Sequence, residues 1–152
     1  MKPACVFCRF LSGKESEHNR LADVVLRTPL TTAFVSPRAW PENVGNVLVV
    51  PNEHVPGLAS CSDALLGAVY ASAKQVAAMM RSAYGCEGIS LRQHDGEAAG
   101  QEVDHLHVHV FPRRPGDRLY ERNAESRFVA PDERARYAER LRRELAGSSS
   151  ST

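Results

Sequence analysis

Residues 103–112 have the sequence Val-Asp-His-Leu-His-Val-His-Val-Phe-Pro, which places three of the chain's six histidines within five positions. Apolar and polar side chains alternate here, as they do on a β-strand that buries one face. The alternation predicts that Leu106, Val108 and Val110 enter a core. The residues expected on the opposite, exposed face are Val103, His105, His107, His109 and Phe111. Neighbouring imidazoles would then lie ~6.6 Å apart, a spacing that suits contacts with different atoms of one substrate.

A short turn flanked by glycines precedes this strand. Residues 95–100 read Asp-Gly-Glu-Ala-Ala-Gly, so Gly96 and Gly100 permit a tight reversal of the backbone. Since the connection is too short for a parallel crossover, the strand expected at residues 88–94 pairs with the histidine strand in antiparallel fashion. Backbone N–H groups exposed in such a turn form a concavity suited to phosphate oxygens, and the Gln101 amide stands at its end.

The rest of the chain indicates an α+β domain. Two β-branched runs, residues 30–36 and 45–51, predict two neighbouring antiparallel strands. A 3.6-residue periodicity predicts a long helix over residues 62–84, ended by Gly85, and a second helix over residues 132–146. Strands grouped together, with helices packed on one side of them, are typical of α+β rather than doubly wound domains.

The composition is typical of one globular domain, and its small net charge does not indicate a nucleic-acid or membrane partner. The chain has 152 residues, 43% of them hydrophobic, with 19 basic and 18 acidic side chains and a formal charge of +1. A chain of this length buries roughly two-thirds of its unfolded surface, which excludes a mainly disordered protein. The small net charge argues against a broad nucleic-acid or membrane surface. We expect a single domain over residues 1–147 and a disordered tail at residues 148–152.

The N-terminal sequence and the cysteines predict a cytoplasmic protein with metal or redox chemistry. No run approaches the ~20 apolar residues of a membrane span, and the first residues lack the apolar region of a signal peptide. In the reducing cytoplasm the four cysteines are not expected to form a disulfide framework. The motif Cys5-Val6-Phe7-Cys8 therefore indicates a metal site or a redox pair.

The residue pattern leaves three interpretations of the histidine row open. The first is a strand whose polar face happens to be rich in histidine. The second is a metal site in which imidazoles two residues apart share a zinc ion, although no carboxylate follows at short range. In the third, a neutral imidazole attacks a phosphorus atom held by the glycine turn, because a histidine of ordinary pKa, near ~6.5, is mostly unprotonated in the cytoplasm.

Longer stretches of the chain resemble the histidine triad family. The resemblance covers roughly residues 5–120 and is carried by Cys5-Val6-Phe7-Cys8, residues 33–37, residues 45–51 before His54, and Asp95-Gly96 through Arg113. Pro112-Arg113 followed by Gly116-Asp117 is most similar to the fragile histidine triad branch, which cleaves dinucleoside polyphosphates. The implied fold is an antiparallel sheet of about five strands with one long central helix and a C-terminal helix packed on it. A homodimer and a small nucleotide substrate are also implied.

The resemblance implies cleavage at the α-phosphate of dinucleoside polyphosphates or nucleoside phosphoramidates. His107 would attack phosphorus to form a nucleotidyl-histidine that water hydrolyses, and His105 would orient His107 through its backbone carbonyl. His109 and Gln101 match positions that hold phosphate oxygens and assist the leaving group. The implied substrate-binding positions are Phe34 and Ser36, near base and ribose, and His94, Gly100, Gln101 and Glu102. Since a carboxylate beside phosphate is unfavourable, the contact expected of Glu102 comes from its backbone N–H.

The resemblance further implies a structural zinc ion. Several bacterial members and the related uridylyltransferases hold zinc with two such cysteines, a histidine after the second strand and the first triad histidine. The matching residues here are Cys5, Cys8, His54 and His105. A closed site of four protein ligands is structural, and no organic cofactor is implied. The alternatives to the nucleotidyl-histidine enzyme are a zinc-dependent hydrolase with the histidines as metal ligands and a non-catalytic nucleotide-binding module.

Overall fold

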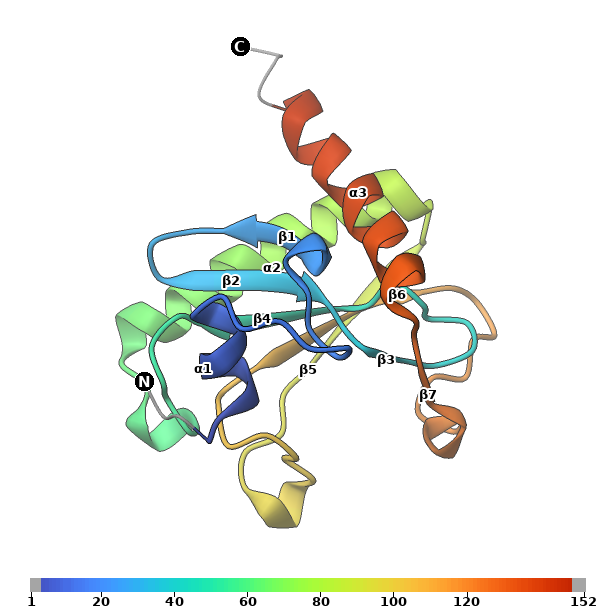
Figure 1. Ribbon diagram of the computed structural model, residues 1–152. Coiled ribbons are helices and arrows are strands. Elements are labelled where there is room, and N and C mark those ends of the chain that lie inside the picture. The colour runs from blue at the N-terminus through green and yellow to red at the C-terminus, as the bar shows by residue number, and fades with distance from the viewer. Residues whose placement is uncertain (1–3, 149–152) are drawn as a thin grey trace.

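A computed structural model describes residues 4–148, which form an α+β domain on one antiparallel sheet. The five strands lie in the order β1-β2-β4-β6-β5 (Figure 1). Their bounds are β1 Val24–Arg27, β2 Thr31–Val35, β4 Val47–Pro51, β5 Gly88–Arg92 and β6 Val108–Arg113. Neighbouring strands are antiparallel throughout, which confirms the fold class and the five-stranded sheet. A second sheet pairs β3, Arg38–Ala39, with β7, Arg127–Phe128.

Helices cover both faces of the large sheet. The two long helices, α2 (Asp63–Tyr84) and α3 (Pro131–Ser148), pack on one face, and the short α1 (Val6–Leu11) packs on the other (Figure 1). Helix α3 extends beyond the predicted residue 146 and includes Ser148. The rest of the tail that was predicted to be disordered, residues 149–152, lies outside the described residues. Single 3₁₀ turns occur at Leu21–Asp23, Leu58–Ser60, Glu97–Ala99 and Asn123–Glu125.

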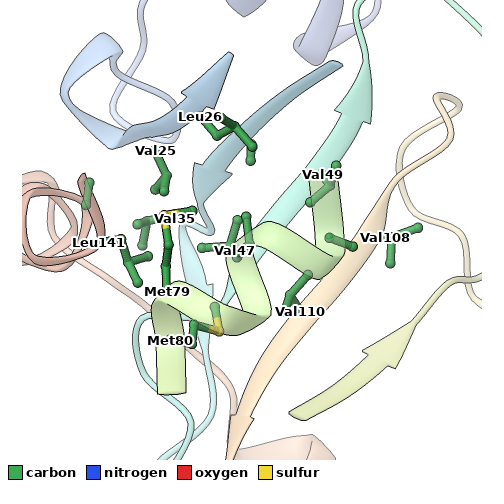
Figure 2. Packing of buried hydrophobic residues seen from close by; sticks show 14 of the residues in the cluster. Val25, Leu26, Val35, Val47, Val49, Met79, Met80, Val108, Val110 and Leu141 are labelled. Carbon is green, nitrogen blue, oxygen red and sulfur yellow. The ribbon is translucent and has the colours of Figure 1, made fainter. Parts of the chain in front are cut away.

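The main core lies between the sheet and the two long helices. Alternate residues of the central strands point toward α2, as Figure 2 shows for Val47, Val49, Val108 and Val110. Met79 and Met80 of α2 belong to the same buried cluster. The helix begins and ends as its sequence predicts, because the Ser62 hydroxyl accepts a hydrogen bond from the Leu65 N–H at 3.2 Å and Gly85 takes a φ of +63°.

The strand that carries the histidines is shorter than predicted. It begins at Val108 rather than at residue 103. Before it, the backbone bends, because the His105 N–H donates to the Val103 carbonyl at 2.7 Å and the Leu106 N–H donates to the Val55 carbonyl at 2.6 Å. Residues 103–107 therefore do not follow the alternation of an extended strand.

The first strand and the first helix have no counterpart among the predicted elements. β1 has only four residues, and α1 has six, with Cys5 as its N-cap. Elements this short carry little periodic signal. Within residues 4–148, none of the helices combines the length and the apolar character that crossing a membrane requires.

Candidate active site and metal cluster

A backbone hydrogen bond fixes the His107 ring just before β6. Its Nδ1 lies 2.7 Å from the carbonyl oxygen of His105. A carbonyl oxygen can only accept, so Nδ1 carries the proton and the lone pair of the neutral ring lies on Nε2. The residue is 7% exposed, and burial lowers the pKa of His107 below its ordinary value. His107 therefore presents an unprotonated ring nitrogen, as nucleophilic attack requires.

The His109 ring lies beside His107 on the face of the sheet opposite α2. The two ring centroids are 5.2 Å apart, and His109 stacks on Phe111 with 2° between the ring planes. Burial lowers the pKa of His109 well below its ordinary value, and the nearby His107 and Arg92 lower it further. Nδ1 of His109 is buried and has no hydrogen-bond partner among the described residues. This nitrogen can serve a ligand or a water molecule, because native proteins pair most buried polar groups.

The prediction of an exposed stripe is wrong, because His107 is 7% exposed and Phe111 has no exposed surface. The ring of His105 also turns away from the other two imidazoles toward Cys5 and Cys8. None of the surface of His105 is exposed, and burial lowers its pKa to about 4. Its Nε2 lies 2.9 Å from the carbonyl oxygen of Pro51, which assigns the ring proton to Nε2. The Nδ1 lone pair consequently points toward Cys5 and Cys8. The bend before β6 causes this departure from the strand alternation.

Four side chains that can bind a metal ion meet at the start of α1. The donor atoms of Cys5, Cys8, His54 and His105 all lie within 4.8 Å of one another. His105 Nδ1 lies 3.4 Å from the sulfur of Cys5 and 3.7 Å from that of Cys8, and His54 Nδ1 lies 3.4 Å from the Cys8 sulfur. A tetrahedral zinc site with Zn–S bonds of ~2.3 Å and Zn–N bonds of ~2.0 Å separates sulfur from nitrogen by ~3.5 Å.

The surroundings of the cluster also suit a metal. Helix α1 places the two thiols one turn apart, and the Cys5 sulfur accepts a hydrogen bond from the Cys8 N–H at 3.5 Å. The Pro51 carbonyl holds the outer nitrogen of His105, a contact that commonly orients a metal-bound imidazole. Burial raises the pKa of the Cys5 thiol, so a bound cation would be needed to stabilise its thiolate.

The glycine turn is braced by the Gln101 side chain. Its Oε1 accepts a hydrogen bond from the Gly96 N–H at 2.7 Å, and its Nε2 donates to the carbonyls of Pro56 and Val103 at 2.8 and 3.0 Å. Gly96 and Gly100 have φ values of +88° and +86°, which explains the glycines at both ends. Gln101 thus sets the shape of the turn in which its side chain was expected to meet phosphate. His94 lies against the same turn, with its Nδ1 contacting the Ala99 carbonyl oxygen.

Three other predicted binding residues are engaged with the protein itself. The Ser36 hydroxyl bonds to the backbone of Arg38, donating to its carbonyl at 2.9 Å and accepting from its N–H at 3.1 Å. The Glu102 carboxylate is exposed and lies 3.6 Å from the Arg38 guanidinium. Phe34 has no exposed surface, so it supports the site from within the core instead of offering a face to a base.

The ring of Phe7 lies against Phe34 and two of the histidines. Its ring centroid lies 5.6 Å from that of Phe34, 5.4 Å from that of His107 and 5.7 Å from that of His105. Sequence reasoning missed this residue, although its position between Cys5 and Cys8 could have indicated it. Phe7 links the metal cluster to the candidate nucleophile through ring contacts.

The sequence matches the HIT domain family model over residues 17–116. This chain belongs to the HIT family. The match runs from the loop before β1 to the turn after β6, so it contains the three histidines of the row.

Named relatives and solved structures agree with this assignment. The chain is 38% identical over 90 residues to the nitrilase and fragile histidine triad fusion protein NitFhit of Caenorhabditis elegans, with 59% of this chain and 20% of that protein covered. It is 33% identical over 96 residues to the asymmetrical bis(5'-nucleosyl)-tetraphosphatase of Schizosaccharomyces pombe, covering 63% of this chain. The chain spans 52% of the length of the yeast relative. A Zn-bound histidine triad family protein from Mycobacterium smegmatis matches with a TM-score of 0.80 at 27% identity, covering 98% of each chain.

The HIT fold brings together two groups of predicted residues. His105 belongs to the metal cluster through its ring and to the candidate active site through its carbonyl, while the neighbouring rings of His107 and His109 belong to the candidate active site alone. Arg92 was missed, although it lies directly across from His109 on β5. The antiparallel pairing of these strands was predicted, but the register that sets Arg92 opposite His109 depends on the conformation of the turn between them.

Proposed function

We propose that this HIT protein hydrolyses nucleotides at the α-phosphate of dinucleoside polyphosphates or nucleoside phosphoramidates, through a nucleotidyl-His107 intermediate. The observation that carries the proposal is the bond between His107 Nδ1 and the His105 carbonyl, which leaves the Nε2 lone pair free. The name of the yeast relative, a bis(5'-nucleosyl)-tetraphosphatase, supports a substrate of the first class.

Two displacements at phosphorus complete the reaction. His107 Nε2 donates its lone pair to the α-phosphorus, a P–N bond forms, and the bond from phosphorus to the leaving group breaks with its electron pair on that group. The imidazolium is stabilised because its Nδ1–H already donates to a carbonyl. Water then attacks the same phosphorus and loses a proton to the solvent as the P–N bond breaks, which returns the electron pair to Nε2 and releases a nucleoside monophosphate.

The other predicted residues would bind and orient the phosphate group of the substrate. His109 would bind phosphate oxygens and assist the leaving group by hydrogen bonding from its neutral ring, which lies beside that of His107. Gln101 and Gly100 would hold the turn so that backbone N–H groups, including that of Glu102, face the phosphate. His94, which contacts the Ala99 carbonyl in the same turn, would lie next to the bound phosphate. Donors fixed before the reaction stabilise the charge that develops on the phosphoryl oxygens.

We also propose that the metal bound by Cys5, Cys8, His54 and His105 is Zn²⁺. The thiolate and imidazole donors suit zinc, and the Mycobacterium smegmatis structure is named as zinc-bound. Four protein donors leave no open position for water, so the ion would tie the N-terminal segment to His105 and take no part in the chemistry. This separation of cluster and nucleophile disfavours the alternative of a zinc-dependent hydrolase.

The remaining proposals concern the whole protein. We propose a single HIT domain over residues 1–147, a cytoplasmic location, no organic cofactor and no stable nucleic-acid or membrane partner. We propose a homodimer as well, because β5 is an edge of the sheet and its Leu91 side chain is 41% exposed. Sedimentation of the purified protein as a monomer would contradict the dimer and leave the chemistry untouched.

A rapid-quench experiment tests the chemistry. The wild type and His107→Ala are mixed with diadenosine triphosphate labelled in the α-phosphate and quenched with base, and the protein is examined for label. We expect a labelled protein and adenosine monophosphate from the wild type and neither from the variant. His18→Ala, which changes an exposed histidine, is the matched control and should behave as the wild type. Binding of the nucleotide without turnover would establish the non-catalytic module instead.

A further inference from the structure

Arg92 extends the candidate active site beyond His109. It ends β5 and pairs across the sheet with His109, so their side chains leave the same face. Opposite residues of antiparallel strands have Cβ atoms ~4.5–5.5 Å apart. The positive charge of Arg92 is close enough to the His109 ring to lower the pKa of that ring. Arg92 therefore lies across the strand pair from His109, whose ring lies beside that of His107.

Two aromatic rings hold the guanidinium of Arg92 in place. Its central carbon lies 4.9 Å from the ring centroid of Trp40 and 4.9 Å from that of Phe111. These rings meet edge to face, with centroids 5.3 Å apart and 79° between their planes. Stacking on two rings limits the motion of a long side chain, so the guanidinium is oriented before any ligand arrives.

The guanidinium lacks the carboxylate that normally accompanies a half-buried arginine. Arg92 forms no ion pair within the described part of the chain, and its buried Nε has no hydrogen-bond partner there. Burial lowers the pKa of Arg92, which means that the protein alone disfavours its charge. By contrast, the buried Arg134 has the Asp23 carboxylate 3.0 Å away. An oriented and uncompensated cation beside two imidazoles is a binding site for an anion.

We infer that Arg92 binds the phosphate groups on the leaving-group side of the scissile bond and makes the enzyme prefer polyphosphate leaving groups. The inference rests on the proposed function, because it places the α-phosphate at His107. A leaving group that contains further phosphates carries negative charge past His109 to Arg92. The ammonia released from a phosphoramidate carries none. The planar guanidinium can donate two parallel hydrogen bonds to phosphate oxygens, which an ammonium group cannot match.

Two substrates and two substitutions test this assignment. Hydrolysis of diadenosine triphosphate is compared with that of adenosine 5'-phosphoramidate, in the wild type, Arg92→Met and Arg92→Lys. Methionine keeps an unbranched apolar stem against Trp40 and Phe111, and lysine restores the charge without the planar group. Arg140→Met is the matched control, because Arg140 stacks on the rings of Tyr84 and Tyr137 in another part of the fold. Melting curves of all variants check the packing.

The expected result is a loss that depends on the leaving group. In Arg92→Met, kcat/KM for the triphosphate should fall about tenfold to a hundredfold further than kcat/KM for the phosphoramidate, since a hydrogen-bonded charge is removed from one reaction only. Arg92→Lys should recover part of that difference, and Arg140→Met should show none. Equal losses on both substrates, or no loss on either, would overturn the assignment while the proposed function stands. A wild type that hydrolyses neither substrate and forms no adduct would overturn the proposed function and the inference with it.

Discussion

The Asp117 carboxylate accepts two hydrogen bonds from the Arg113 guanidinium, each 2.8 Å long, across the turn that follows β6. Asn43 Nδ2 and the backbone N–H groups of Arg114 and Leu119 donate to the same carboxylate, at 2.9, 3.0 and 3.2 Å. Five donors on a side chain that is 1% exposed fix the path of this segment. They thereby hold Leu119 in a small buried cluster with Trp40 and Phe111, the two rings on which Arg92 stacks.

Replacing this carboxylate should give a stability loss that depends on pH. The Arg113 hydrogen bonds hold the pKa of Asp117 well below its usual range. Because the folded-state pKa is depressed from an unfolded value near ~3.9, the stabilisation is complete above about pH 5 and is lost progressively as the pH falls from there toward the folded-state pKa. Asp117→Asn should lower the free energy of unfolding by about 3 kcal/mol at pH 7. Urea unfolding should show that the difference in the free energy of unfolding between variant and wild type becomes smaller below about pH 4.

A surface ion pair provides the control for that experiment. Glu121 pairs with Arg118 at 2.6 Å, and both side chains are 65% exposed. Glu121→Gln should change stability by less than about 1 kcal/mol at any pH. A difference in the free energy of unfolding between Asp117→Asn and the wild type that stays constant from pH 7 to pH 3 would contradict the prediction. It would show that the stability does not depend on ionisation of the Asp117 carboxylate.

Removing a cluster thiol should release metal and lower thermal stability. Cys5→Ser takes away one of four donors, so the protein should lose about one zinc ion and melt about 10 °C lower or more. Some turnover should remain, because His107 is not among the donors. Elemental analysis and calorimetry provide the two measurements, and Cys61→Ser, at a half-exposed cysteine outside the cluster, should change neither. Wild-type protein prepared without chelators that contains no zinc would remove this hypothesis.

Breaking the buried ion pair between Asp23 and Arg134 should lower the free energy of unfolding more than breaking a surface pair. Neither side chain is exposed, and Arg134 also donates to the carbonyls of Val129 and Glu17 at 2.6 and 2.7 Å. Arg134→Met leaves the Asp23 carboxylate buried without its partner, which should cost about 3–5 kcal/mol in urea unfolding. Arg143→Met removes an exposed partner of Glu139 on the same helix and serves as the control. Equal losses in the free energy of unfolding for Arg134→Met and Arg143→Met would contradict the prediction that burial makes the first pair more important for stability.

Gln101→Ala should loosen the glycine turn without unfolding the protein. The Gln101 side chain accepts one hydrogen bond from Gly96 within the turn and donates two, to the carbonyls of Pro56 and Val103. Their loss should speed amide hydrogen exchange over residues 95–101 and lower kcat/KM by about tenfold, because the phosphate donors are no longer fixed. Gln75→Ala, on an exposed position of α2, is the control. Unchanged exchange in the turn would show that other contacts hold it.

Much of the fold follows from periodicity, and the errors lie where the chain leaves regular structure. The long helix was predicted to within one residue, because its apolar stripe and its glycine C-cap are both local signals. The bend at residues 103–107 was not predicted, since it depends on a backbone bond to Val55, which is distant in sequence. The same bend turned the His105 ring from the expected stripe into the cluster. Phe34 is buried for a reason that is also non-local, because α1 covers the face of the sheet on which it lies.

His105 joins two parts of the molecule that are otherwise separate. Its ring lies among the sulfur atoms, while its carbonyl sets the tautomer of the neighbouring imidazole. The history of a sample should consequently influence its measured rate: protein stripped of its ion, or stored until the thiols oxidise, should react more slowly although every group at the phosphate is intact. On the proposed function, rates measured on different preparations are expected to agree only when their metal content is the same.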